Sequence, residues 1–150
     1  MAANAPNEDL DPPTDVWRMM TGLMIERKQN FPGIAASYGL NPGALHALLS
    51  LDENEPRSMS ALAGAWRCDA SNVTWLVDRL EEKGLVERRA HATDRRVRTV
   101  VLTRKGAKTR AQAQALLFEA PESIRNLSPA DLAALQRILT KIAPPGRPAF

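Results

Sequence analysis

The sequence contains few of the residues that build disulfides, metal sites and catalytic centres. Cys68 is the only cysteine among 150 residues, so one chain cannot form an internal disulfide. The two histidines, His46 and His91, lie far apart and have no cysteine or glutamate at metal-ligand spacing beside them. We also find no Ser–His–Asp grouping, no paired acids in a marked context and no glycine-rich phosphate loop. These absences argue against a metal site and against an enzyme.

Long apolar segments are absent as well. No apolar run approaches the roughly 20 residues that a membrane-spanning helix needs. The first residues, MAANAPNEDLDPPTD, are acidic and lack the apolar segment of a secretory signal. We therefore predict a cytoplasmic protein with no role at a membrane. A length of 150 residues with 44% hydrophobic and 25% charged residues indicates one globular domain with its own core.

The positive charge is concentrated in the middle of the sequence. Residues 57–110 contain 13 Lys/Arg and 6 Asp/Glu, a net charge of +7, whereas the remainder contains 7 and 11, a net charge of −4. A basic segment between acidic flanks is typical of a surface that binds a polyanion. A charged surface that only faces solvent is the alternative when charge is considered alone.

Capping residues and the spacing of apolar side chains predict six helices. Five of them are expected over residues 14–30, 41–52, 69–83, 103–120 and 128–142. The remaining, shorter helix is expected to begin at Ser60. The stretch 31–40 is interrupted by proline and glycine and has room for a short helical turn. Residues 85–89 and 97–102 read as two strands joined by a charged loop, 90–96.

Residues 60–103 therefore give a short helix, a tight turn, a second helix and a two-stranded ribbon. This order is that of a winged helix-turn-helix, so the predicted fold class is mainly α with a small β-ribbon. Duplex DNA is the partner that such a unit binds.

The flanking helices are predicted to form a dimer interface in addition to supporting the DNA-binding unit. We expect a single domain over 14–142, in which 57–103 is the winged helix-turn-helix and 14–52 and 104–142 are supporting helices. Residues 1–13 read as a disordered arm and 143–150 as a loose tail. The apolar stripes on the supporting helices exceed what a small DNA-binding unit must bury, and pairing across a two-fold axis would cover them. Packing back onto the same chain is the alternative.

The helix over 69–83 has one apolar face and one polar face. The apolar residues follow helical spacing and fix the buried face: Val73, Leu76, Val77 and Leu80. Ser71, Asn72 and Thr74 remain outside near the helix N-terminus, where small polar side chains reach base edges. Trp75 either lies against a sugar or a thymine methyl group or folds back onto the wing. Arg79 is placed to meet a phosphate or an acidic neighbour, and Asp78 to pair with a basic residue.

The loop of the ribbon is the second expected DNA contact. Arginine enters a narrow minor groove because the negative potential is enhanced there. Asp94 lies two residues before Arg96 and is expected to hold its guanidinium. The other arginines of the ribbon are candidates for phosphate contacts: Arg88, Arg89, Arg95 and Arg98. Because side chains alternate between the two faces of a ribbon, not all of these arginines can point at DNA.

The run LAGAWRCDASNVTWLVDRLEEKGLVERR, followed by DRRVRTVVLTRKG, resembles the MarR family of bacterial transcription regulators. The resemblance implies a homodimer on a pseudo-palindromic operator, most often as a repressor, with Asp94 and Arg96 as the wing-tip pair. It also implies release of DNA by a small aromatic compound. The sequence departs from the family at Arg67, where glycine is frequent, and at Trp75, where a smaller or basic residue is common. A winged-helix module that docks a protein or coats DNA without reading bases is the alternative function.

Two further groups of residues have a structural and a functional interpretation. Cys68 falls where the family has an apolar residue that packs inward, so we interpret it as packing rather than as a redox sensor. Methionine and aromatic residues of the N-terminal third are candidates to line a ligand pocket: Trp17, Met20, Met24, Tyr38 and His46. A role in the core is the alternative for these five residues.

Overall fold

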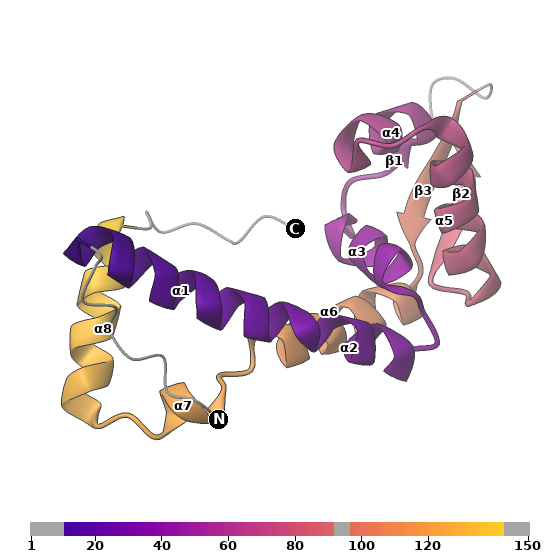
Figure 1. Cartoon of the computed structure of the whole chain (residues 1–150). Helices are drawn as coiled ribbons and strands as arrows, with labels where there is room; N and C mark the ends of the chain where they lie inside the picture. The colour runs from indigo at the N-terminus through magenta and orange to yellow at the C-terminus, as the bar shows by residue number, and fades with distance from the viewer. Residues whose placement is uncertain (1–10, 92–96, 143–150) are drawn as a thin grey trace.

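The computed structural model describes residues 11–91 and 97–142. The described helices are α1 (Pro12–Gln29), α2 (Phe31–Ser37), α3 (Pro42–Ser50), α4 (Met59–Trp66), α5 (Ala70–Glu82), α6 (Arg104–Phe118), α7 (Glu122–Arg125) and α8 (Pro129–Ile142). The described strands are β1 (Arg57–Ser58), β2 (Val86–Ala90) and β3 (Arg98–Leu102). Figure 1 shows that α3, α4, α5 and the strands form one end of the molecule, whereas α1 extends away from α2 to reach α8.

The strands form one antiparallel sheet in the order β1–β3–β2. In the β2–β3 hairpin Val86 lies opposite Leu102, and Ala90 lies opposite Arg98. On the other edge of β3, Arg57 and Ser58 of β1 pair with Val100 and Thr99. The sequence predicted two strands, and the third was missed because two residues are too few to show an alternating pattern.

Side-chain caps fix the starts of the central helices. The side chains of Asn41, Ser58, Asp69 and Thr103 accept the backbone N–H three residues later, as an N-cap does. The sequence placed the start of α4 at Ser60, but the cap is Ser58, two residues earlier. It also placed the start of α1 at Thr14, whereas that helix begins at Pro12, a residue suited to the first turn.

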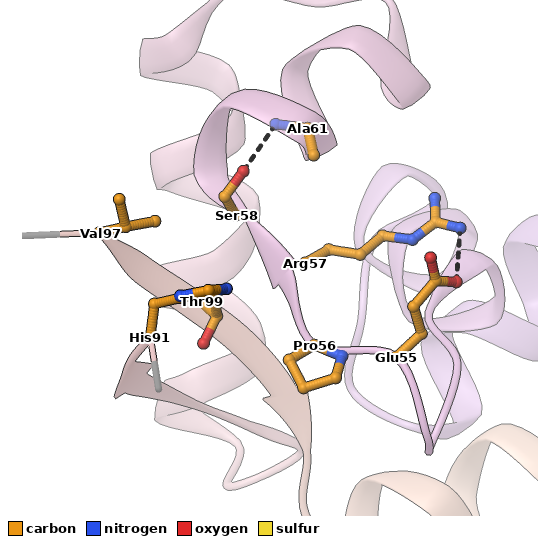
Figure 2. Close-up of a pocket in the computed structure, with 8 residues that line it drawn as sticks. All are labelled: Glu55, Pro56, Arg57, Ser58, Ala61, His91, Val97 and Thr99. Carbon is orange, nitrogen blue, oxygen red and sulfur yellow. Dashed lines mark hydrogen bonds and ion pairs between the residues drawn. The ribbon is translucent and has the colours of Figure 1, made fainter. Parts of the chain in front are cut away.

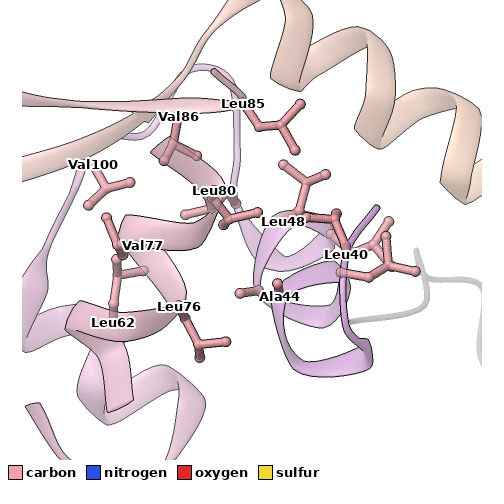
Figure 3. Packing of buried hydrophobic residues seen from close by; sticks show 14 of the residues in the cluster. Leu40, Ala44, Leu48, Leu62, Leu76, Val77, Leu80, Leu85, Val86 and Val100 are labelled. Atoms are coloured by element: carbon pink, nitrogen blue, oxygen red, sulfur yellow. The ribbon is translucent and has the colours of Figure 1, made fainter. Parts of the chain in front are cut away.

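The core lies between α3, α5 and the sheet. As Figure 3 shows, Leu80 of α5 lies between Leu48 of α3 and Val86 of β2, and Val77 of α5 lies beside Val100 of β3. The predicted buried face of α5 is confirmed, since its four apolar residues are all buried: Val73, Leu76, Val77 and Leu80. Cys68 is half-buried and packs against this core, as does Trp66.

Helix α6 connects the core to the terminal helices. It begins where the Thr103 N–H donates to the Leu85 carbonyl at 3.0 Å and the Thr103 hydroxyl donates to the Gly84 carbonyl at 2.7 Å. Further along α6, Arg110 Nε donates to the Leu49 carbonyl of α3 at 3.2 Å. At the far end the Arg27 guanidinium of α1 contacts the carbonyls of the last turn of α6. Helix α6 is therefore held at both ends.

The terminal helices α1 and α8 are exposed to solvent along their length. Neither has a buried residue, and both carry large apolar side chains on the surface. Between residues 11 and 142, leaving aside 92–96, no helix has the length and apolarity to span a bilayer.

Candidate nucleic-acid interface

The N-terminus of α5 is organised around the Asp69 cap. The carboxylate of Asp69 accepts the backbone N–H of Asn72 at 2.8 Å and the hydroxyl of Ser71. These two hydrogen bonds, the Ser71 hydroxyl first, hold the pKa of the Asp69 carboxyl below its usual range. The cap residue therefore stays ionised at neutral pH and fixes the first turn, from which the predicted base-reading side chains project.

The residues predicted to read bases lie together on the outer face of α5. Ser71, Asn72 and Thr74 are all exposed, and so is Trp75, which lies one turn after Ser71. The Thr74 hydroxyl donates to the Ala70 carbonyl at 2.8 Å, and the Ser71 hydroxyl donates to Asp69, as described above. Each hydroxyl has one proton to donate, so both groups can only accept a further hydrogen bond.

The C-terminal half of α5 is joined to the wing by ion pairs. Arg88 of β2 pairs with Glu81 and with Asp78, and its backbone N–H donates to Glu81 Oε1 at 3.1 Å. Arg79 pairs with Glu82 at 3.0 Å, one turn along the same helix. Both predicted partnerships, Asp78 with a basic residue and Arg79 with an acidic neighbour, are therefore present. Arg88 acts as a clamp between strand and helix, which makes it a poor phosphate contact.

The remaining arginines of the wing differ in position. Arg89 is exposed and pairs with Glu87 on its own strand. Arg98 is exposed at the first position of β3. The predicted wing-tip residues lie outside the described part of the chain: Asp94, Arg95 and Arg96. The His91 N–H donates to the Val97 carbonyl at 2.9 Å and closes the described part of the hairpin below that loop.

The turn between α4 and α5 has a conformation that favours glycine. Arg67 has φ 49° and ψ 46°, in the left-handed region, and is the one described residue other than glycine with positive φ. Glycine, which is frequent at this position in the family, is also the residue type that this backbone conformation favours. The signal for this conformation in the sequence was the family resemblance, which marked Arg67 as a departure from glycine.

A cavity beside the wing was not anticipated from the sequence. It has a volume of about 460 Å³ and lies between the β1–α4 junction and the two ends of the described wing (Figure 2). Its lining is Glu55, Pro56, Arg57, Ser58, Ala61, His91, Val97 and Thr99. Arg57 and Glu55 pair with each other at 3.0 Å. The pairing of β1 with β3 brings residues 55–58 beside the wing, and β1 was not recognised from the sequence.

The five candidate pocket residues lie on different elements of the described structure. Trp17 and Met20 line an apolar cavity of about 680 Å³ together with residues at the start of α1 and the end of α8. Met24 is 63% exposed further along α1, and His46 is exposed on α3. Tyr38 follows α2 and packs against the core. Helix α1 carries its first turns away from α2 (Figure 1).

Three comparisons with known proteins agree with this architecture. Residues 40–97 match the model of the MarR family. The chain is 34% identical over 128 residues to a Thauera aromatica protein described as a putative transcriptional regulatory protein for the hcr operon, covering 84% of this chain and 76% of that protein. It is 37% identical over 91 residues to the transcriptional repressor MprA of Escherichia coli, covering 59% of this chain and 52% of MprA. Among solved structures, a mutant of S. aureus MepR bound to an oligodeoxyribonucleotide superposes with a TM-score of 0.68 and 22% identity, covering 89% of this chain and 96% of that one.

The helix-turn-helix of α4 and α5, followed by the β2–β3 wing, defines a winged-helix DNA-binding transcription regulator. Because the family model covers α4, α5 and β2 and the Thauera relative extends the similarity over most of the chain, the chain belongs to the MarR family. Membership places it among transcription regulators rather than enzymes.

Proposed function

We propose that the chain is a cytoplasmic repressor that binds a pseudo-palindromic operator as a homodimer. The observation that carries this proposal is the outer face of α5, where Ser71, Asn72, Thr74 and Trp75 are exposed at the N-terminal half of the helix. This is the half that enters the major groove in helix-turn-helix proteins. The name of the relative MprA supports repression as the sign of regulation.

Dimerisation is supported by the terminal helices. Large apolar side chains are exposed on both: Val16, Trp17, Met19, Leu23, Met24 and Ile25 of α1, and Leu132, Ile138, Leu139 and Ile142 of α8. An exposed apolar surface shared by two helices is typical of a subunit interface. A second copy related by a two-fold axis would cover these side chains and set two copies of α5 at fixed spacing.

Control by a small aromatic compound is the further part of the proposal. The apolar cavity of about 680 Å³ lies against the same faces of α1 and α8, and it has the size of a small-molecule site. A compound bound there would change the spacing of the two copies of α5 through the helices that join them. DNA release would follow from that change in spacing.

The experiment that tests sequence reading uses Asn72. Duplexes are selected from a random library by the full chain, and affinities for the selected operator and for a scrambled duplex are then measured. Asn72→Ala should weaken operator binding by roughly 1–3 kcal/mol, the range for one lost base contact, and leave scrambled DNA unaffected. Asn126→Ala, which removes an exposed amide at the end of α7, is the matched control.

Two outcomes would contradict this function. A chain that enriches no sequence and binds all duplexes alike coats DNA without reading bases. An Asn72→Ala variant that behaves like Asn126→Ala on the selected operator would show that α5 does not read base edges with this amide. The first outcome would make the winged unit a docking module or a non-specific binder, and the second would assign base reading to side chains other than Asn72.

A further inference from the structure

Trp75 is exceptional among the exposed apolar residues of the chain. Thirteen large hydrophobic residues are exposed in the described segments, and twelve of them lie on α1, α6 and α8. Trp75 is the remaining one, with 52% of its surface exposed on α5. It therefore stands apart from the surface assigned to dimerisation and lies among the polar side chains of the proposed DNA-reading face.

The neighbours of Trp75 leave the face with little capacity for base hydrogen bonds. The hydroxyls of Ser71 and Thr74 already donate their protons within α5 and its cap. Arg79, the cation of the last turn, is held by Glu82. Asn72, three residues before Trp75, is the side chain that keeps both a donor and an acceptor for a base edge.

An exposed indole matches one chemical group of the major groove. Thymine presents a C5 methyl group there, and apolar side chains recognise it by contact. Side chains three residues apart on a helix are neighbours, so Trp75 reaches the base pair beside the one that Asn72 contacts. We propose that Trp75 selects a thymine in each half-site through this methyl group. The inference rests on the proposed sequence-specific function and adds the base group that is read.

The test replaces the thymines of the selected operator one at a time with deoxyuridine, which lacks the methyl group and keeps every hydrogen-bonding atom. At one position in each half-site we expect about a fourfold loss of affinity, the value of one buried methyl group. Trp75→Ala should bind the unmodified operator more weakly and show no further loss at that position. Trp75→Phe keeps an apolar ring and should keep the sensitivity to deoxyuridine.

A second readout locates the contact directly. 5-Iododeoxyuridine places a photoreactive iodine where the methyl group stands, and irradiation should crosslink the operator to the peptide that contains Trp75. A thermal melt of Trp75→Ala shows whether the variant is still folded at the temperature of the binding assay, which separates a lost contact from a lost fold.

The outcomes distinguish this inference from the function on which it rests. Specific, Asn72-dependent operator binding that is indifferent to deoxyuridine at every thymine would overturn the role of Trp75 and leave the function intact. An equal deoxyuridine penalty in the parent chain and in Trp75→Ala would overturn it as well. Binding that selects no sequence at all would overturn both proposals.

Discussion

Helices α5 and α8 both carry an apolar stripe at helical spacing, but the two stripes have different environments. All four apolar residues of the α5 stripe are buried within the chain, against α3 and the strands. Helix α8 has no buried residue, and its Ile138 and Ile142 are more than half exposed. An amphipathic pattern therefore predicts that a face will be covered, while the rest of the fold decides which molecule covers it.

This difference divides the stability of the chain into two parts. The winged unit carries its own core, so its folding should not depend on protein concentration. The terminal helices expose the surface that the proposed partner covers, so their stability should rise with concentration, as mass action requires for a subunit interface. Helix α6 joins the two parts, because it begins on the Leu85 carbonyl and ends at Arg27 of α1.

The largest effect is expected at the start of α6, where the two parts of the chain join. A Cβ atom on Gly106 would lie 1.8 Å from the backbone oxygen of Leu85, closer than non-bonded atoms can approach. Gly106→Ala should therefore lower the free energy of unfolding by roughly 4 kcal/mol or more, because a backbone oxygen cannot move aside as a flexible side chain can. Urea denaturation measures the change.

Gly64→Ala is the matched control for that substitution. Gly64 lies within α4 with nothing within 4 Å of the added Cβ atom, so the same exchange should raise stability by about 1 kcal/mol. Equal effects at the two glycines would show that the docking of α6 on Leu85 is not as close as the structure has it.

The comparison between α5 and α8 is tested by one substitution in each stripe. Leu80 is fully buried, whereas Leu139 is 39% exposed and lines the cavity between α1 and α8. Leu80→Ala should cost about 3 kcal/mol at any protein concentration, because it leaves a cavity in the core. Leu139→Ala should cost the isolated chain less than that and should weaken the dimer.

Sedimentation equilibrium and urea denaturation at two protein concentrations separate these effects. If Leu139→Ala assembles as the parent chain does, the exposed face of α8 does not form the proposed interface. The apolar stripe of α8 would then not be covered by a second copy.

The extent to which sequence predicted the structure follows the same division. The buried face of α5, its cap Asp69 and the start of α6 at Thr103 were predicted, because capping and spacing are encoded within a few neighbouring residues. β1 was not predicted, because its two residues form a strand only through their pairing with β3. The four-residue helix α7 also lacked a recognisable local signal.

The candidate interface shows this limit more clearly. The exposure of Asn72 and Trp75 follows from helical spacing alone, so the sequence was sufficient. The clamp formed by Arg88 with Asp78 and Glu81 depends on how β2 lies across α5, so the sequence offered Arg88 equally as a phosphate contact. The proposed pocket residues were grouped by residue type, and they lie on α1, on α3 and at the end of α2, so whether they form one pocket stays a prediction.

The smallest effect is expected at the turn that joins α4 to α5. A residue other than glycine in the left-handed region costs about 1–3 kcal/mol, whereas the added freedom of glycine in the unfolded chain costs about 0.4–1 kcal/mol. Arg67, at φ 49°, is such a residue, so Arg67→Gly should raise the free energy of unfolding by about 1 kcal/mol. Arg137→Gly, the same exchange inside α8, should instead lower helix stability by about 1 kcal/mol. Opposite signs in urea denaturation would show that backbone conformation decides the effect of the arginine at the turn. A loss of stability at both positions would mean that the Arg67 side chain contributes more to the fold than the strained backbone costs.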